Sequence, residues 1–302
     1  MTRIFAAADI GSNTAHLLVA ATDGELVMRL DNLNEWIPLG EMVARVGEIP
    51  DEMIEQLILA MREFRRVATA KKAVSLYVFA TEAMRQATNH ELVLERIREE
   101  AQVNVEIISP TREAELSLRG VLLDTNHLGI GILFEVGGGS AQIGRVLHGQ
   151  LVEKQSLPIG TGRLIAQAGL RNPCPASAIQ AAEQYVERML DRVEIHVDRG
   201  NAVASGGVGR GLWRALHPDS EKTISIEELD YLAWSTARLP LDRIVSRFGV
   251  KTKRAGTLLP GAIIYRSLMR RFGLKEIAVS EFGVREGAIL EMATTRVATS
   301  PL

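Results

Sequence analysis

The chain has 302 residues, of which 46% are apolar and 24% charged, and its formal net charge is −2. This length has room for about two domains of ~150 residues, and the apolar content is ordinary for a globular protein with a sizeable core. No stretch reaches the ~20 consecutive apolar residues of a membrane span, and the charge gives no general attraction to nucleic acid or acidic lipid. The composition therefore argues against both partners, and a polyanionic ligand would need a local cluster of cations.

A cytoplasmic location is expected from two features of the sequence. The single cysteine, Cys174, cannot form an internal disulfide, which fits a reducing compartment. The apolar run that follows Arg3 is interrupted by Asp9 before it reaches the length of a secretion signal.

The first half of the chain predicts an α/β layer fold. Its expected elements are a strand over 4–9, a tight turn, a strand over 14–20, a helix from near 51, a strand over 74–80, a helix over 93–101 and a strand over 105–108. A strand pair followed by alternating helices and strands is typical of this class. Ser109 then has the character of an N-cap, with Pro110 at the first helical position.

The chain becomes polar and loses its periodicity around residues 124–129, where we place a domain boundary. The expected elements after it are strands over 130–136 and 143–147, a loop over 172–175, a helix over 179–193, a helix to about 239 and a final helix over 284–297. Ser225 and Glu228 have the spacing of a capping box at the start of the helix to 239.

An internal repeat links the two halves. Residues 9–17, DIGSNTAHL, and 135–143, EVGGGSAQI, share the order acid, β-branched residue, glycine, two variable residues, hydroxyl, alanine, polar residue and aliphatic residue. Each copy joins two strands, so each half is expected to open with a hairpin whose loop presents backbone N–H groups to an anion. The candidate phosphate-binding residues of the two loops are Gly11, Ser12, Asn13, Gly137, Gly138, Gly139 and Ser140.

The acid before each loop, Asp9 or Glu135, is suited to hold Mg²⁺, which uses one or two carboxylates and keeps much of its water. The alternative is a pair of ordinary glycine-rich turns, although the match between the copies favours the phosphate site. A third glycine cluster contains Gly206 and Gly207 and follows a strand over 202–204. It is either a further nucleotide-binding turn or a simple strand-to-helix connection.

Six segments in one order carry a family resemblance. They are DIGSN at 9–13, ATEAMRQATN at 80–89, ISPTREAELSLRGV at 108–121, EVGGGSAQ at 135–142, LPIGTGRL at 157–164 and VSEFGVREG at 279–287. Together they resemble the exopolyphosphatase and guanosine pentaphosphate phosphohydrolase (Ppx/GppA) family in its short two-domain form. The resemblance extends from residue 9 to about residue 290.

The resemblance implies the fold of actin, Hsp70 and sugar kinases: two similar α/β domains of ribonuclease H-like type with an active-site cleft between them. It also implies that the last helix returns to the first domain. The expected domains are therefore 1–124 with about 288–302, and 125–287.

The resemblance further implies a Mg²⁺-dependent hydrolase that releases the terminal phosphate of polyphosphate or guanosine pentaphosphate by attack of water. The family's catalytic glutamate corresponds to Glu113, and its phosphate-contacting arginine corresponds to Arg85. Arg163 and Arg285 lie in matching motifs and are candidates for further substrate contacts, as are the two glycines of the third cluster. A homodimer is expected by analogy.

Two departures from the family pattern leave a second hypothesis open. The second loop of the family reads Asp-Ile-Gly-Gly-Gly-Ser-Thr-Glu, whereas this chain has Glu135 in place of the aspartate and Gln142 in place of the last glutamate. Gln142 can position a water or a hydrated metal, but it cannot accept a proton. The chain is therefore either a hydrolase or a polyphosphate- or nucleotide-binding regulator with weak or lost hydrolysis; a sugar kinase is a weaker third hypothesis.

Overall fold

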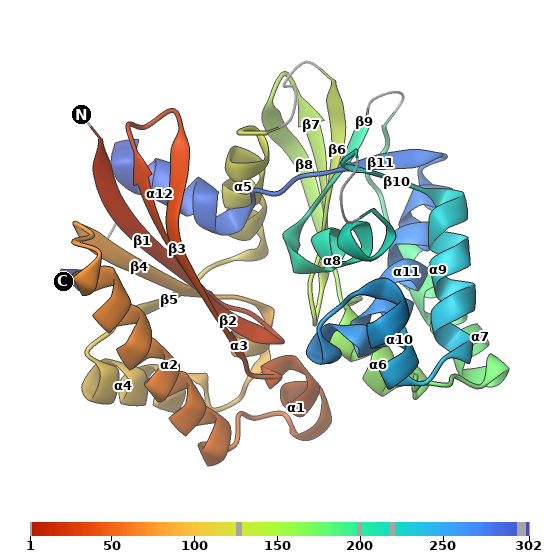
Figure 1. The fold of residues 1–302 in the computed structure, drawn as a ribbon, viewed down its shortest axis with the longest axis horizontal. Coiled ribbons are helices and arrows are strands. Elements are labelled where there is room, and N and C mark those ends of the chain that lie inside the picture. The colour runs from red at the N-terminus through yellow and green to blue at the C-terminus, as the bar shows by residue number, and fades with distance from the viewer. Residues whose placement is uncertain (1, 125–128, 198–200, 218–220, 295–299, 302) are drawn as a thin grey trace. The chain divides into compact units, whose positions relative to one another are not determined.

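The computed structural model describes residues 2–124, 129–197, 201–217, 221–294 and 300–301 (Figure 1). The chain forms two compact units, unit 1 from Met1–Leu123 and Phe282–Leu302 and unit 2 from Asp124–Glu281. The sequence placed the second boundary later, near 287–288. The chain enters unit 1 earlier because Val284 already packs on a core of that unit.

Unit 1 contains a mixed sheet of order β12-β4-β1-β2-β3, with β5 also paired to β4. Its strands are β1 Arg3–Ile10, β2 Thr14–Thr22, β3 Val27–Trp36, β4 Ser75–Ala80, β5 Val105–Ile107 and β12 Ser300–Pro301. The predicted hairpin of β1 and β2 is confirmed, and β1 pairs with β4 in parallel, as β4 does with β5. β3 was not predicted, because an edge strand with few buried side chains needs no alternating apolar pattern.

The helices of unit 1 cover both faces of this sheet. They are α1 Leu39–Val46, α2 Asp51–Ala70, α3 Glu82–Gln86, α4 His90–Ala101, α5 Pro110–Val121 and α12 Val284–Thr294. Successive residues of β1 alternate between two cores: Ala6 and Ala8 join the core that α2 and α4 complete, whereas Phe5 and Ala7 join the core with α5 and α12. A strand buried on both faces reads as a continuous apolar run, which explains the sequence FAAA. Residues 295–297 of the predicted last helix lie outside the described residues.

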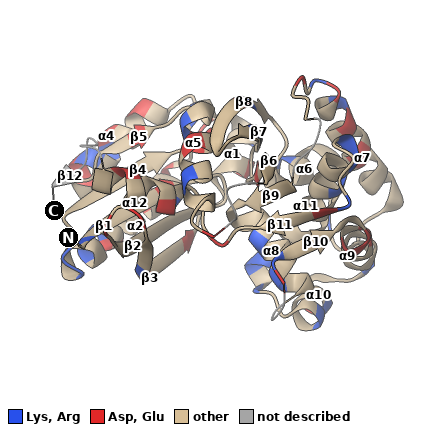
Figure 2. Ribbon diagram, turned by 90° about the horizontal axis from the view of Figure 1, so that it is seen from above, with Lys and Arg blue, Asp and Glu red and all other residues tan. Residues whose placement is uncertain are grey.

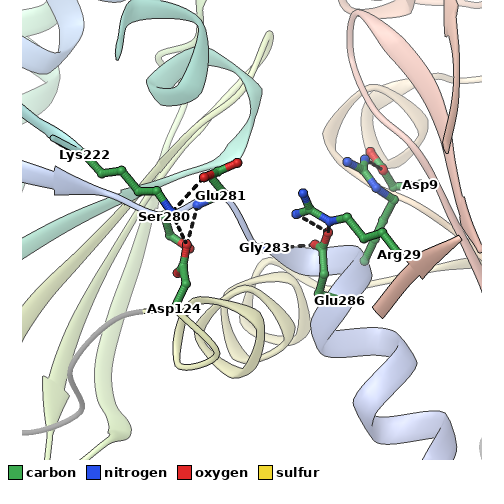
Figure 3. Close-up of polar contacts among 9 residues, drawn as sticks. Asp9, Arg29, Asp124, Lys222, Ser280, Glu281, Gly283 and Glu286 are labelled. Atoms are coloured by element: carbon green, nitrogen blue, oxygen red, sulfur yellow. Dashed lines mark hydrogen bonds and ion pairs between the residues drawn. The ribbon is translucent and has the colours of Figure 1, made fainter. Parts of the chain in front are cut away.

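Helices α5 and α12 pack with their backbones in contact. A Cβ atom added to Gly120 would lie 2.0 Å from the Gly283 carbonyl oxygen, and one added to Gly287 would lie 1.8 Å from the Leu116 carbonyl oxygen. The start of α12 is held by Glu286, whose carboxylate accepts hydrogen bonds from the Gly283 N–H at 3.0 Å and the Arg29 Nε at 2.9 Å (Figure 3). These contacts fix α5, the helix that carries Glu113.

Unit 2 repeats the sheet of unit 1. Its strands are β6 Ile130–Val136, β7 Ala141–Leu147, β8 Gln150–Leu157, β9 Asn201–Ser205, β10 Thr223–Ser225 and β11 Glu276–Val279, in the order β10-β11-β9-β6-β7-β8. The path β8-β7-β6-β9-β11 corresponds to β3-β2-β1-β4-β5 of unit 1, with the same antiparallel and parallel pairings. The repeat that the sequence predicts is therefore a repeat of topology.

The helices of unit 2 are α6 Thr161–Ala168, α7 Ala176–Leu190, α8 Gly206–Leu216, α9 Ile226–Arg238, α10 Leu241–Phe248 and α11 Thr252–Arg271. The predicted capping box is confirmed: the Ser225 hydroxyl accepts from the Glu228 N–H, and the Glu228 carboxylate accepts from the Ser225 N–H. The twenty-residue α11 was not predicted. It contains Pro260, and its buried residues lie all round the helix, so the sequence lacks an amphipathic period.

The two ends of unit 2 are bound to each other. The Asp124 carboxylate accepts from the Ser280 hydroxyl at 2.6 Å and from the Glu281 N–H at 2.8 Å, and Lys222 pairs with Glu281 at 2.7 Å (Figure 3). The points where the chain enters and leaves this unit are thereby fixed beside one another. Over the described residues, no helix is both long and apolar enough to cross a membrane.

Candidate active site

Three parallel strands bring the predicted catalytic residues of unit 1 to one edge of its sheet. Ile10 at the end of β1 lies in register with Ala80 of β4, which lies in register with Ile107 of β5. The chain leaves all three strands at this edge, which is where open α/β sheets bind ligands. β1 runs into the first glycine loop, β4 into the helix that carries Arg85, and β5 into the helix that carries Glu113.

Arg85 and Glu113 form a half-buried ion pair at this edge. The Arg85 Nη2 lies 3.1 Å from the Glu113 Oε2, and the two side chains are 15% and 13% exposed. The same guanidinium donates to the Ile108 carbonyl oxygen at 2.6 Å and lies 3.3 Å from Glu82. The structure thus brings together the two residues that the sequence singled out and adds Glu82 as a second partner of Arg85. Glu82 lies three residues before Arg85, a spacing at which helical side chains can pair, so this contact could have been predicted.

The first turn of α5 fixes where Glu113 lies. The Ser109 hydroxyl accepts from the Arg112 N–H at 3.1 Å, as predicted for an N-cap, and Pro110 occupies the first helical turn. Glu113 follows within that turn, where the partial positive charge of the helix N-terminus favours a carboxylate.

Two basic side chains lie beside Asp9, and the sequence did not indicate either contact. It lies on β1 opposite His16 of β2, whose Nδ1 is 4.0 Å from the Asp9 Oδ1. Arg285, in the first turn of α12, forms an ion pair with the same oxygen. Arg285, considered above as a substrate contact, therefore neutralises the predicted metal ligand Asp9 in this structure.

The two glycine loops have one geometry. The Gly11 N–H donates to the Thr14 carbonyl at 2.9 Å, and the Gly137 N–H donates to the Ser140 carbonyl at 2.9 Å. These two amides close their turns and are not available to an anion. Gly11 and Gly137 therefore do not offer their own N–H groups to a phosphate, as the sequence had suggested. The residues that follow are Ser12 in unit 1 and Gly138 and Gly139 in unit 2.

Ser12, Gly138 and Gly139 are buried, and within the part of the chain that the structure describes their N–H groups donate to no protein acceptor. A buried amide without a partner is costly, and a concave run of such amides is an anion-binding feature. Asn13 and Ser140 complete the two loops and lie directly before β2 and β7.

Each loop is supported by the segment that follows the third strand of its sheet. In unit 1 the Gly40 N–H donates to the Ser12 carbonyl at 2.7 Å, and in unit 2 the Arg163 N–H donates to the Gly138 carbonyl at 3.0 Å. The Arg163 Nε also donates to the Gly139 carbonyl at 2.9 Å. Arg163, considered above as a substrate contact, is in this structure a brace of the loop.

The two residues that depart from the family pattern face each other across β6 and β7. Glu135 lies opposite Gln142 in the register of the hairpin, and Gln142 is buried and donates to the Ser140 hydroxyl at 3.4 Å. Glu135 approaches Gly206, where an added Cβ would lie 3.4 Å from the Glu135 Oε1. Burial, and next the negative charge of Glu135, raise the pKa of Tyr265 far above its usual range.

The third glycine cluster is a strand-to-helix turn beside the second loop. β9 ends at Ser205, in register with Glu135 of β6, and α8 begins at Gly206. Gly206 has φ +84°, a conformation that favours glycine. The carbonyl of Gly207 accepts from the Arg254 Nη1 at 3.3 Å. Arg254 comes from α11, and no sequence motif predicted this contact.

The carboxylates fit Mg²⁺ only in its hydrated, phosphate-bound form. Among the described residues no three His, Cys, Asp or Glu side chains gather as a ligand set. Mg²⁺ does not require such a cage, because it binds through one or two carboxylates together with water and substrate phosphate oxygens. Asp9 and Glu135 each supply one carboxylate at the end of a strand, and one oxygen of Asp9 is already paired with Arg285.

The comparisons with known proteins agree with this architecture. The chain is 26% identical to exopolyphosphatase 1 of Mycobacterium leprae over 93% of this chain and 87% of the relative. It is 27% identical to exopolyphosphatase 1 of Mycobacterium tuberculosis H37Rv over 93% and 86%. Each alignment covers 93% of this chain and therefore extends over both units.

Solved structures show the same fold. The Aquifex aeolicus member of the Ppx/GppA protein family superposes with a TM-score of 0.82 at 24% identity, covering 99% of this chain and 100% of that one. An exopolyphosphatase from Cytophaga hutchinsonii gives 0.86 at 21% identity, covering 97% and 98%. The predicted two-domain α/β fold of actin-like type, with two mixed sheets, is thereby confirmed. The family model described as the Ppx/GppA phosphatase family matches residues 18–296, and the chain belongs to this family.

Proposed function

We propose that this protein is a Mg²⁺-dependent phosphoanhydride hydrolase that releases terminal phosphate from inorganic polyphosphate, guanosine pentaphosphate or both. The observation that carries the proposal is the Arg85–Glu113 pair at the edge of the unit 1 sheet, at 3.1 Å. A carboxylate beside a fixed guanidinium can take a proton from an attacking water while the cation binds the phosphoryl oxygens.

In this proposal Glu113 is the general base and Arg85 is a phosphate contact. Hydrogen bonds to the Ile108 carbonyl and to Glu82 hold the Arg85 guanidinium in one position, so a phosphate must bind where the guanidinium already lies. Such pre-organisation matters because phosphoryl transfer to water depends mainly on positioning and charge neutralisation.

The loops are proposed to bind phosphate oxygens through the buried amides of Ser12, Gly138 and Gly139. Asp9 and Glu135 are the residues that would hold Mg²⁺, and the metal would neutralise charge on the phosphates. For Asp9 to do so, the guanidinium of Arg285 must share or yield the carboxylate.

The test is phosphate release from long-chain polyphosphate and from guanosine pentaphosphate, measured in parallel with Mg²⁺ and Mn²⁺. Glu113→Gln keeps the shape of the side chain and removes the base, so release is expected to fall by about 10²- to 10⁴-fold. Binding of a fluorescent polyphosphate should persist. Glu115→Gln, on the same helix but exposed, is the matched control and should retain full activity. Full activity in Glu113→Gln, or no release with any divalent metal, would overturn the proposal.

A second candidate, a polyphosphate- or nucleotide-binding regulator, is favoured by one observation. The position where the family carries a glutamate holds a neutral, buried Gln142 that is hydrogen-bonded to Ser140. This candidate predicts thermal stabilisation by the ligand without release of phosphate. It also predicts that the Glu135→Asp, Gln142→Glu double variant gains hydrolysis. Rapid turnover by the unaltered protein excludes it.

A further inference from the structure

Two carboxylates share one nitrogen atom of Arg85. The Arg85 Nη2 lies 3.1 Å from the Glu113 Oε2 and 3.3 Å from the Glu82 Oε2, and both acidic side chains are partly buried. Two carboxylates beside one cation leave a net negative charge, at the point where the proposed substrate brings further negative charge. A second carboxylate weakens the attraction of the site for phosphate, so the presence of Glu82 requires another reason.

Glu82 is the more local of the two acidic partners. It lies three residues before Arg85 in the same short helix, α3, and its Oε1 accepts a hydrogen bond from the Gln86 Nε2. The contact with Glu113 instead joins α3 to α5, a helix that carries charges of both signs (Figure 2). Movement of the Glu113 side chain would therefore break one contact of Arg85 and leave the pair within α3 intact.

One donor of the Arg85 guanidinium has no acceptor. Its Nη1 donates to the Ile108 carbonyl oxygen at 2.6 Å, whereas its Nε is buried and meets no acceptor in the described part of the chain. A buried donor without an acceptor is costly. The Nε–H and one N–H of Nη2 point to the same side of a guanidinium and together can bind an anion. A phosphoryl group that satisfies Nε would therefore compete for Nη2 as well.

We infer that Glu82 is a positioning residue that holds Arg85 while Glu113 leaves the ion pair to act on water. The inference rests on the proposed function, in which Arg85 contacts the phosphate and Glu113 is the base. A phosphoryl oxygen at the Nε and Nη2 edge displaces Glu113, and Glu82 together with the Ile108 carbonyl keeps the guanidinium in place. Repulsion between the two carboxylates favours this exchange.

The displaced carboxylate then serves the reaction. A water oxygen bonds to the terminal phosphorus, and the proton of that water passes to Glu113. The bond between this phosphorus and the bridging oxygen breaks, and its electron pair leaves on the bridging oxygen. A Glu113 oxygen that is bound to Arg85 accepts the proton less readily, because a charge-assisted hydrogen bond must first be broken. Glu82 thus increases turnover and decreases the affinity for phosphate.

Glu82→Gln tests the inference, because it keeps the shape of the side chain and removes its charge. Glu91→Gln is the matched control, since Glu91 is exposed and lies in the next helix, α4. Hydrolysis of tripolyphosphate with Mg²⁺ gives kcat and KM. Binding of tripolyphosphate is measured by calorimetry in the Glu113→Gln background, so that hydrolysis does not interfere, and thermal unfolding checks that each variant folds.

The expected result is a change of opposite sign in turnover and in affinity. Glu82→Gln should lower kcat by about tenfold, because Glu113 then stays paired with Arg85. It should bind tripolyphosphate about three- to tenfold more tightly, with a lower KM, because Arg85 loses a competing carboxylate. Glu82→Asp keeps the charge and should restore the affinity and part of kcat. Glu91→Gln should change neither quantity by more than about twofold.

Two results would overturn the inference. One is an unchanged kcat in Glu82→Gln. The other is a fall in kcat without tighter binding, which would make Glu82 only a structural support of Arg85. If the unaltered protein releases no phosphate, the proposed function fails. Binding in the Glu113→Gln background then still shows whether Glu82 opposes an anion at Arg85, and absence of tighter binding there refutes the inference separately.

Discussion

The backbone contact between α5 and α12 makes Gly287→Ala a sharp test of the structure of unit 1. In an open helical position this substitution stabilises, because alanine has the higher helix propensity by about 1 kcal/mol. At Gly287 the new Cβ would lie 1.8 Å from the Leu116 carbonyl oxygen and 2.7 Å from its carbonyl carbon. Ordinary contact begins near 3.4 Å, so α12 would have to move away from α5 by about 1.6 Å.

That displacement cannot be absorbed by a side-chain rotation, because the obstructing atoms belong to the backbone of a helix packed on the sheet. Overpacking of a core typically costs about 1–3 kcal/mol and sometimes more, and here the shift would also separate Ala288 and Ile289 from their core. We expect a net loss of about 3 kcal/mol in the free energy of unfolding of unit 1, or roughly 6–12 °C in melting temperature. Phosphate release should fall as well, since α5 carries Glu113.

The measurement is urea and thermal unfolding followed by circular dichroism, with Gly211→Ala as the control. Gly211 lies within α8, and an added Cβ there would meet nothing within 4 Å. The control should therefore be stabilised by about 0.5–1 kcal/mol. If Gly287→Ala melts at or above the temperature of the unaltered protein, α5 and α12 are not packed as described.

Three further substitutions test other features. Ser225→Ala removes the capping box of α9 and should cost about 1 kcal/mol in urea unfolding. Burial raises the pKa of the Tyr265 hydroxyl, and the negative charge of Glu135 raises it further. Above about pH 10 the unfolded state therefore loses a proton that the folded state keeps. Stability should fall by up to about 1.4 kcal/mol per pH unit above pH 10, and Tyr265→Phe should reduce that slope, which unfolding at pH 8–11 would reveal. Arg29→Gln leaves the buried carboxylate of Glu286 without its cation and should cost about 2 kcal/mol, whereas an unchanged midpoint would show that the pair adds nothing.

Much of the fold could be predicted because its signals are local. The hairpins, the Ser109 cap and the capping box at Ser225 each depend on residues within a few positions of one another. The elements that escaped prediction lack such a signal. β3 is a polar edge strand, and α11 is buried all round and interrupted by Pro260. Their place follows from pairing and packing with distant segments.

The candidate site divides in the same way. Sequence motifs singled out Arg85 and Glu113, and parallel pairing of β4 with β5 explains why residues 28 apart form an ion pair. No local sequence feature predicts the ion pair between Arg285 and Asp9. These residues are 276 positions apart and meet only because α12 packs on the sheet that contains β1. The same holds for Arg254, which reaches Gly207 from another helix.

The sequence by itself determined the two glycine loops and their duplication. Each turn closes through a hydrogen bond between residues three positions apart, and the copies at Gly11 and Gly137 keep that spacing. Only the tertiary structure decided which charges act on those loops. Such contacts are set by distance in space: Arg285, which pairs with Asp9, and Arg163, which donates to the Gly139 carbonyl, both come from segments outside the loops.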